Sequence, residues 1–153
     1  MRRSLLISLA SLAMVVSAPA LAKNYALLIG NSNYSIGALD NPANDANDLA
    51  NTLRSIGFDT MVRVNVDAEG MRNLIRDFGS KLKNNDGIGL FFFAGHGVQV
   101  NGENYMLPVA FPFKNEQDVE KNGVQANMVL RYMEDSKNRV NVVVLDACRN
   151  NPF

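Results

Sequence analysis

The sequence predicts an α/β fold in which helices cover both faces of a mainly parallel sheet. Short apolar runs that suit buried strands alternate along the chain with apolar stripes at helical spacing, and no repeat or low-complexity tract interrupts this order. Strands that alternate with helices need crossover connections, which are right-handed and make neighbouring strands parallel. The 153 residues suffice for one domain with an apolar core but not for two ordinary ones.

The first strand and the first helix are predicted within residues 25–57. Residues 25–29 form a short apolar run that ends at Gly30, which is typical of a strand buried on both faces. Pro42 near its start and Gly57 just past its end delimit the helix. The apolar stripe of this helix is Ala46, Leu49, Ala50, Leu53 and Ile56.

A second strand and helix follow, and then a third strand. Residues 58–66 alternate weakly between apolar and polar and predict the second strand. Asp67 is the predicted N-cap of the second helix. The apolar stripe of that helix is Met71, Leu74, Ile75, Phe78 and Leu82. Residues 89–94 are almost entirely apolar and predict a third, buried strand.

The last part of the chain combines a hairpin, a loop, a helix and a strand. Residues 99–107 predict a β-hairpin, because the Asn-Gly pair at its centre favours a turn with positive φ. Residues 114–123 are polar and are expected to form a loop. A third helix is predicted over residues 126–135, and the apolar run 140–145 predicts the fourth strand.

The N-terminus is typical of a secretory signal peptide covering residues 1–22. Arg2 and Arg3 precede an apolar run over residues 5–16, and Ala-Leu-Ala at 20–22 provides a cleavage site of small residues. The run is shorter than the ~20 residues that a spanning helix needs, so a membrane anchor is the less favoured interpretation. The sequence therefore predicts an exported protein, periplasmic or extracellular, whose mature domain covers residues 23–153 and keeps no stable membrane anchor.

Composition excludes several classes of function. Lys plus Arg and Asp plus Glu number 15 each, so no overall positive charge directs the chain to nucleic acid. No GxGxxG or P-loop motif is present, and one His with one Cys offers no spaced zinc ligand set, so no cofactor is expected. Residues 40–48 superficially resemble a calcium loop but lack the glycine and the terminal Glu of an EF-hand.

The most informative residues follow the third and fourth predicted strands. The third strand runs into His96, the only histidine, and the fourth leads through Asp146 to Cys148, the only cysteine. Ligands bind such sheets at the carboxyl ends of the strands, and a thiol needs a base such as imidazole to become a nucleophile near neutral pH. The amides of Gly97 and Cys148 could then donate to an oxyanion. The alternative is a small buried Cys and a His of structural role.

These motifs resemble a known family. The sequence AGHG, followed by LDACR with Cys148 placed 52 residues after His96, is similar to the caspase-like cysteine peptidases (peptidase C14), in particular their metacaspase and paracaspase branch. The resemblance extends to residues 25–30, NPANDANDLANTL and GENYMLP. It implies a caspase-like three-layer sandwich, a protein or peptide substrate, and a dyad of Cys148 with His96 as general base and acid. Some metacaspases require calcium, so calcium dependence stays open.

The resemblance also bears on the S1 pocket that receives the residue before the cleaved bond. Asp-cleaving caspases carry an Arg six residues before an Asp of the first helix, and here that position, counted back from Asp45, is Leu39. In paracaspases, Asp at the positions of Asp45 and Asp146 lines S1, so cleavage after Arg or Lys is predicted by charge complementarity. The alternatives are that Asp45 favours its helix N-terminus and that Asp146 is a turn residue.

The chain departs from the resembled fold in its number of strands. That fold has six main strands, two of them after the nucleophile, and only four are predicted here. The last strands after Cys148 are therefore expected to be lacking, and a C-terminal small-subunit-like half or a homodimer would supply part of the groove. The alternative function is a non-catalytic binding or regulatory module. A different hydrolase or a redox protein is disfavoured, because neither GxSxG nor CxxC is present.

Overall fold

The computed structural model describes residues 22–147. Its helices and strands follow one another along the chain as β1 (Asn24–Gly30), α1 (Pro42–Ser55), β2 (Phe58–Val64), α2 (Ala68–Leu82), β3 (Ile88–Ala94), β4 (Gly97–Val100), β5 (Glu103–Met106), α3 (Glu116–Asn122), β6 (Val124–Gln125), α4 (Ala126–Asp135) and β7 (Val140–Asp146). Of the predicted signal peptide only Ala22 is described, so the assignment of residues 1–22 stays a prediction.

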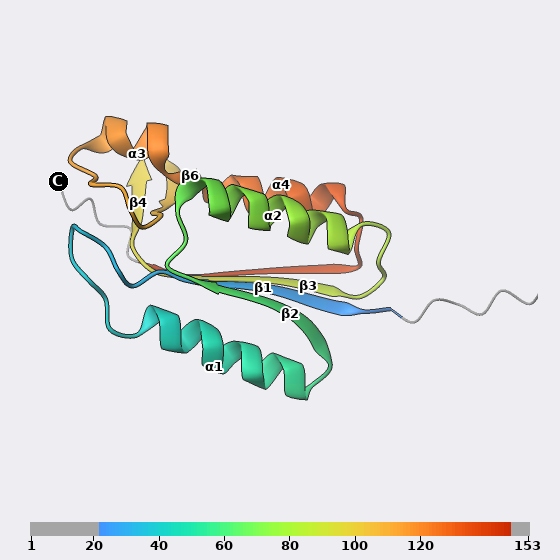
Figure 1. Ribbon diagram of the computed structural model, residues 1–153. Helices are drawn as coiled ribbons and strands as arrows, with labels where there is room; N and C mark the ends of the chain where they lie inside the picture. Colours follow the sequence, from blue (N-terminus) through green and yellow to red (C-terminus); the bar gives the residue numbers. More distant parts are fainter. Residues whose placement is uncertain (1–21, 148–153) are drawn as a thin grey trace, which may run out of the picture.

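The main sheet has four parallel strands in the order β2-β1-β3-β7. Helix α1 packs on one face of this sheet, and α2 and α4 cover the other face (Figure 1). This three-layer α/β arrangement confirms the predicted fold class. Gly30, Ala94 and Asp146 lie in one row of the sheet, at the carboxyl ends of three neighbouring strands.

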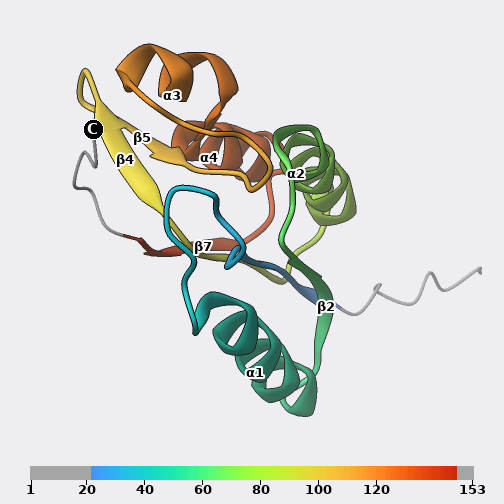
Figure 2. The same cartoon turned by 60° about the vertical axis from the view of Figure 1, so that its left-hand side comes forward.

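A smaller antiparallel sheet, in the order β4-β5-β6, lies beyond the carboxyl end of β3. Together with α3 it lies above that end of the main sheet (Figure 2). The β4–β5 hairpin turns at Asn101 and Gly102, whose φ angles of 51° and 83° confirm the predicted turn with positive φ.

Two apolar clusters bury the two faces of the main sheet, because successive side chains of a strand point to opposite faces. From β1, Leu27 and Ile29 join the cluster under α2 and α4, whereas Ala26 and Leu28 join the cluster under α1. All four side chains are fully buried, which for each Leu or Ile stabilises the fold by roughly 1.5–3 kcal/mol. Gly30 ends β1 where the Pro42 carbonyl at the start of α1 leaves no room for a Cβ.

One sequence prediction is wrong: residues 114–123 are not a loop but contain α3. The Asn115 side chain caps this helix by accepting from the Asp118 amide at 2.9 Å. Only Val119 of the helix is buried, so α3 lacks the apolar stripe by which the other helices are recognised. The two-residue strand β6 after it was not predicted either.

Strand β7 lies at one edge of the main sheet and pairs with β3. The side chains of Val140, Val144 and Leu145 are 43%, 41% and 38% exposed, which is unusual for apolar residues of a parallel strand. An exposed edge of this kind can pair with a further strand. Among the residues described, no helix combines the length and the apolar character needed to cross a membrane.

Candidate active site

His96 is the second residue after the end of β3. Gly95 makes the connection, and a side chain there would overlap with the Tyr34 hydroxyl and approach the Phe93 ring within 2.9 Å. The peptide of Gly95 is tied to the neighbouring strand, because its amide donates to the carbonyl oxygen of Asp146 at 3.2 Å. This hydrogen bond fixes the backbone immediately before His96.

The imidazole of His96 is half-buried and faces the loop between β1 and α1. Its Nε2 lies 2.8 Å from the carbonyl oxygen of Gly37. Since a carbonyl oxygen can only accept a hydrogen bond, Nε2 must carry the proton of the neutral ring. This leaves Nδ1 as the unprotonated nitrogen, which can accept a proton from another group.

Tyr34, from the same loop, contacts both the ring and the backbone of His96. The two ring centroids are 4.5 Å apart with an interplanar angle of 57°. The Tyr34 hydroxyl accepts from the His96 amide at 3.1 Å and donates to the Leu107 carbonyl at 2.9 Å. The Leu107 amide in turn donates to the His96 carbonyl at 2.9 Å. Burial raises the pKa of Tyr34 far above its ordinary value, so the hydroxyl stays neutral.

Asn31 anchors this loop to the rest of the site. Its side chain is fully buried, and its Oδ1 accepts from the Val66 amide at 2.8 Å. Its Nδ2 donates to the carbonyl oxygens of Val66 and Leu107, both at 3.2 Å. One amide side chain thus joins the segments that follow β1, β2 and β5.

The two predicted S1 carboxylates lie at the carboxyl end of the main sheet and are exposed. Asp146 is the last residue of β7, and Asp45 lies in the first turn of α1. Val143 of β7 packs against the cluster under α2 and α4, so strand alternation places Asp146 on the α1 side. The ion pair found within residues 22–147 joins Lys23 and Asp59, so both carboxylates are without a cationic partner there.

Cys148 lies outside the described residues, and the structure therefore does not test its distance from His96. The predicted oxyanion donor Gly97 is the buried first residue of β4. Opposite residues of an antiparallel pair alternate between hydrogen-bonded and non-hydrogen-bonded pairs. The Leu107 amide donates to the His96 carbonyl, so the next pair, Gly97 with Met106, is a non-hydrogen-bonded pair. The ladder thus leaves the Gly97 amide free to donate elsewhere.

No group of three or more metal-ligating side chains occurs in the described part of the chain. Sequence reasoning missed Tyr34 and Gly37, which lie 62 and 59 residues before the histidine they contact. The only available signal was the position of their loop after the first buried strand.

A three-layer α/β fold that presents a hydrogen-bonded histidine at the end of one strand, next to the strand that leads to the only cysteine, defines a protein of the caspase-like class. A family model described as the caspase domain of peptidase C14 matches residues 23–153, and the chain belongs to this family.

The chain is similar to a human protein and to its mouse homolog. The mucosa-associated lymphoid tissue lymphoma translocation protein 1 of Homo sapiens is 33% identical over 125 residues, and its homolog in Mus musculus is 31% identical over 125 residues. Each alignment covers 81% of this chain but only 15% of the human and 14% of the mouse protein. The similarity thus concerns a small part of those longer proteins.

Proposed function

We propose that this peptidase-family domain is a cysteine endopeptidase that cleaves after Arg or Lys through a dyad of Cys148 and His96. The observation that carries the proposal is the hydrogen bond between His96 Nε2 and the Gly37 carbonyl, 2.8 Å long. This bond leaves Nδ1 as the base, at the carboxyl end of the sheet where β7 also ends. Mature residues 23–153 would form the domain, exported by way of the signal peptide.

In the proposed reaction, His96 Nδ1 takes the proton of the Cys148 thiol, and the thiolate attacks the carbonyl carbon of the scissile peptide bond. The amides of Gly97 and Cys148 donate to the oxyanion that forms. The imidazolium then gives its proton to the leaving amine, the C–N bond breaks and a thioester remains. A water molecule, deprotonated by His96, attacks the thioester, and the carboxylic acid product leaves as the thiol re-forms.

The proposed preference for basic residues rests on the negative charges at the carboxyl end of the main sheet. Asp45 and Asp146 are exposed and without a cationic partner among the described residues. A guanidinium offers a planar set of donors that matches a carboxylate, and an ammonium offers a positive point charge. A substrate Arg or Lys would therefore be favoured over neutral or acidic side chains.

A second candidate function is a non-catalytic binding or regulatory module. The exposed apolar side chains of the edge strand β7 favour a partner there, which would be a C-terminal small-subunit-like half or a second copy of the chain. In either case the main sheet would be extended beyond β7. The partner would complete the groove if the domain is an enzyme.

The test is cleavage of fluorogenic peptides that differ only in ending with Arg, Lys or Asp before the leaving group. Cleavage after Arg or Lys that disappears in both Cys148→Ala and His96→Ala supports the endopeptidase. Parallel reactions with calcium and with EDTA decide the calcium dependence. A folded protein that cleaves none of the peptides, alone or with a C-terminal half added, would instead support the module.

A further inference from the structure

Tyr34 makes a set of contacts that the reaction outlined above does not use. Its hydroxyl is the only acceptor described for the His96 amide and also donates to the Leu107 carbonyl. Because the Leu107 amide donates back to the His96 carbonyl, both polar groups of the His96 backbone are held. A tyrosine hydroxyl that is both donor and acceptor can close this ring of hydrogen bonds, whereas a phenylalanine cannot.

The same tyrosine determines how the loop lies against the imidazole. Gly37 is three residues further along the loop, and its carbonyl binds His96 Nε2. The Tyr34 side chain is 6% exposed and packs against the imidazole with a centroid distance of 4.5 Å. The loop thus contacts the imidazole in two ways, by the packing of Tyr34 on one side and by the hydrogen bond from Nε2 to Gly37. Tyr34 also connects the loop to the His96 backbone through its hydroxyl.

The space around Gly95 also depends on the position of the Tyr34 hydroxyl. A Cβ at Gly95 would overlap with the Tyr34 hydroxyl. The residue before the histidine therefore has to be the smallest one for the tyrosine to reach the His96 amide.

We infer that Tyr34 is a positioning residue for His96, which orients the imidazole so that Nε2 binds the Gly37 carbonyl and Nδ1 stays the unprotonated nitrogen. The inference rests on the proposed function of His96 as general base. Without the hydroxyl, the partly buried His96 amide would lack its partner, and the histidine and the Gly37 loop would no longer be held in one arrangement. A misplacement of about 1 Å at a catalytic group can lower a rate about 100-fold.

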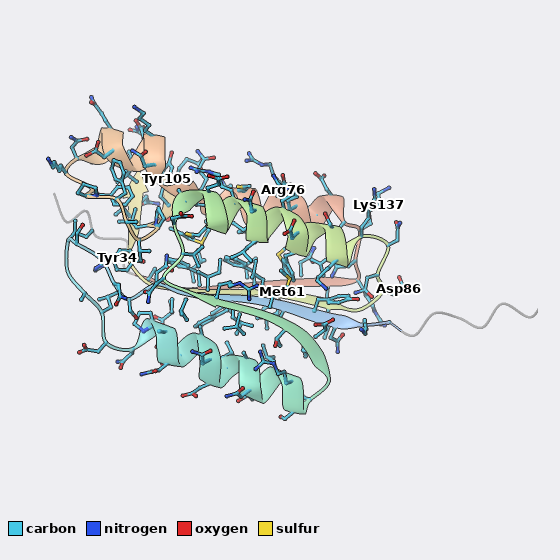
Figure 3. The ribbon with its side chains drawn as sticks, viewed as in Figure 1. Tyr34, Met61, Arg76, Asp86, Tyr105 and Lys137 are labelled. Carbon is cyan, nitrogen blue, oxygen red and sulfur yellow. The ribbon has the colours of Figure 1, made fainter. Side chains whose placement is uncertain are left out.

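The first measurement uses the single histidine of the chain as its own probe. Nitrogen NMR of the full chain labelled in histidine reports the tautomer of one imidazole and needs no catalytic activity. We expect the Nε2-protonated form in the wild type, a mixture of both tautomers in Tyr34→Phe, and the wild-type signal in Tyr105→Phe. Tyr105 is a matched control, because it is 7% exposed and its hydroxyl accepts from Gln125 Nε2 at 3.2 Å. Both tyrosines are labelled in Figure 3.

The second measurement separates positioning from substrate binding. On the peptide cleaved best, Tyr34→Phe should lower kcat about 10- to 100-fold and leave KM within about 2-fold, while Tyr105→Phe keeps both constants. If Tyr34→Phe does not fold, Gly95→Ala tests the same contact with the tyrosine retained, and its histidine signal should change in the same way.

An unchanged histidine signal in folded Tyr34→Phe would overturn the inference, and so would a changed signal with an unchanged kcat. A wild type that cleaves no peptide would refute the proposed function instead. In that case the tautomer measurement would still show whether Tyr34 orients His96, so the two failures are distinguishable.

Discussion

Ala94 and Asp146 are register partners at the last rungs of β3 and β7, and the amide just after Ala94 donates to the carbonyl of Asp146 at 3.2 Å. His96 lies two residues beyond the first of these partners, and Cys148 lies two residues beyond the second. Parallel pairing thus brings two residues that are 52 positions apart in the sequence, Ala94 and Asp146, to equivalent positions of two adjacent strands.

Asp146→Asn should weaken the preference for a basic residue before the cleaved bond. The substitution keeps the size of the side chain and removes its charge, so the ratio of kcat/KM for an Arg peptide to that for a Gln peptide should fall roughly 10-fold. Asp45→Asn should act in the same direction. Asp77→Asn, an exposed aspartate of α2 on the opposite face of the sheet, is the control, and an equal fall there would contradict a local pocket.

Asn31→Ala should lower the free energy of unfolding by roughly 2–3 kcal/mol, because it leaves the Val66 amide without its partner and removes one of the two hydrogen bonds that the Val66 and Leu107 carbonyls each accept. Urea unfolding followed by circular dichroism measures this difference. Asn33→Ala, an exposed position in the same loop, should stay within about 0.5 kcal/mol of the wild type. Equal losses in the two variants would show that the buried hydrogen bonds of Asn31 contribute little.

Thr60→Val should stabilise the protein by about 0.5–1 kcal/mol. Among the described residues, the Thr60 hydroxyl is buried without a hydrogen-bond partner, and valine keeps the shape while favouring a strand. Thr52→Val is the counterpart in α1, where the hydroxyl donates to the Asp48 carbonyl at 3.0 Å, and should bring no gain. A Thr60→Val protein that unfolds at lower urea than the wild type would show that the hydroxyl is solvated.

Tyr34 predicts how stability changes in alkali. Burial raises the pKa of Tyr34 in the folded state above the ordinary value of about 10 that holds in the unfolded chain. Above pH ~10 the unfolded state therefore binds fewer protons than the folded state, and the free energy of unfolding falls as the pH rises. Urea titrations between about pH 9 and 11 should show a steeper fall for the wild type than for Tyr34→Phe, and parallel curves would contradict this.

The fold was largely predictable from sequence because its strands are apolar runs and three of its helices carry apolar stripes. Helix α3 was not, because its cap Asn115 and its single buried residue Val119 leave no periodic pattern. His96 was found by its position after a predicted strand, whereas Asp45 and Asp146 were assigned to the S1 pocket through the resemblance to paracaspases. The roles of Tyr34 and Gly37 depend on the path of an irregular loop across the sheet, which no local pattern encodes.

The Gly37 oxygen that orients His96 belongs to the main chain, and every amino acid carries such an atom. No side-chain truncation removes this acceptor, although alanine at Gly37 itself would strain the backbone. The φ angle of 141° at Gly37 favours glycine there, so the residue type at this position is tied to the path of the loop. Replacing the amide between residues 37 and 38 with an ester, which makes the carbonyl a weaker acceptor, would be the direct chemical probe.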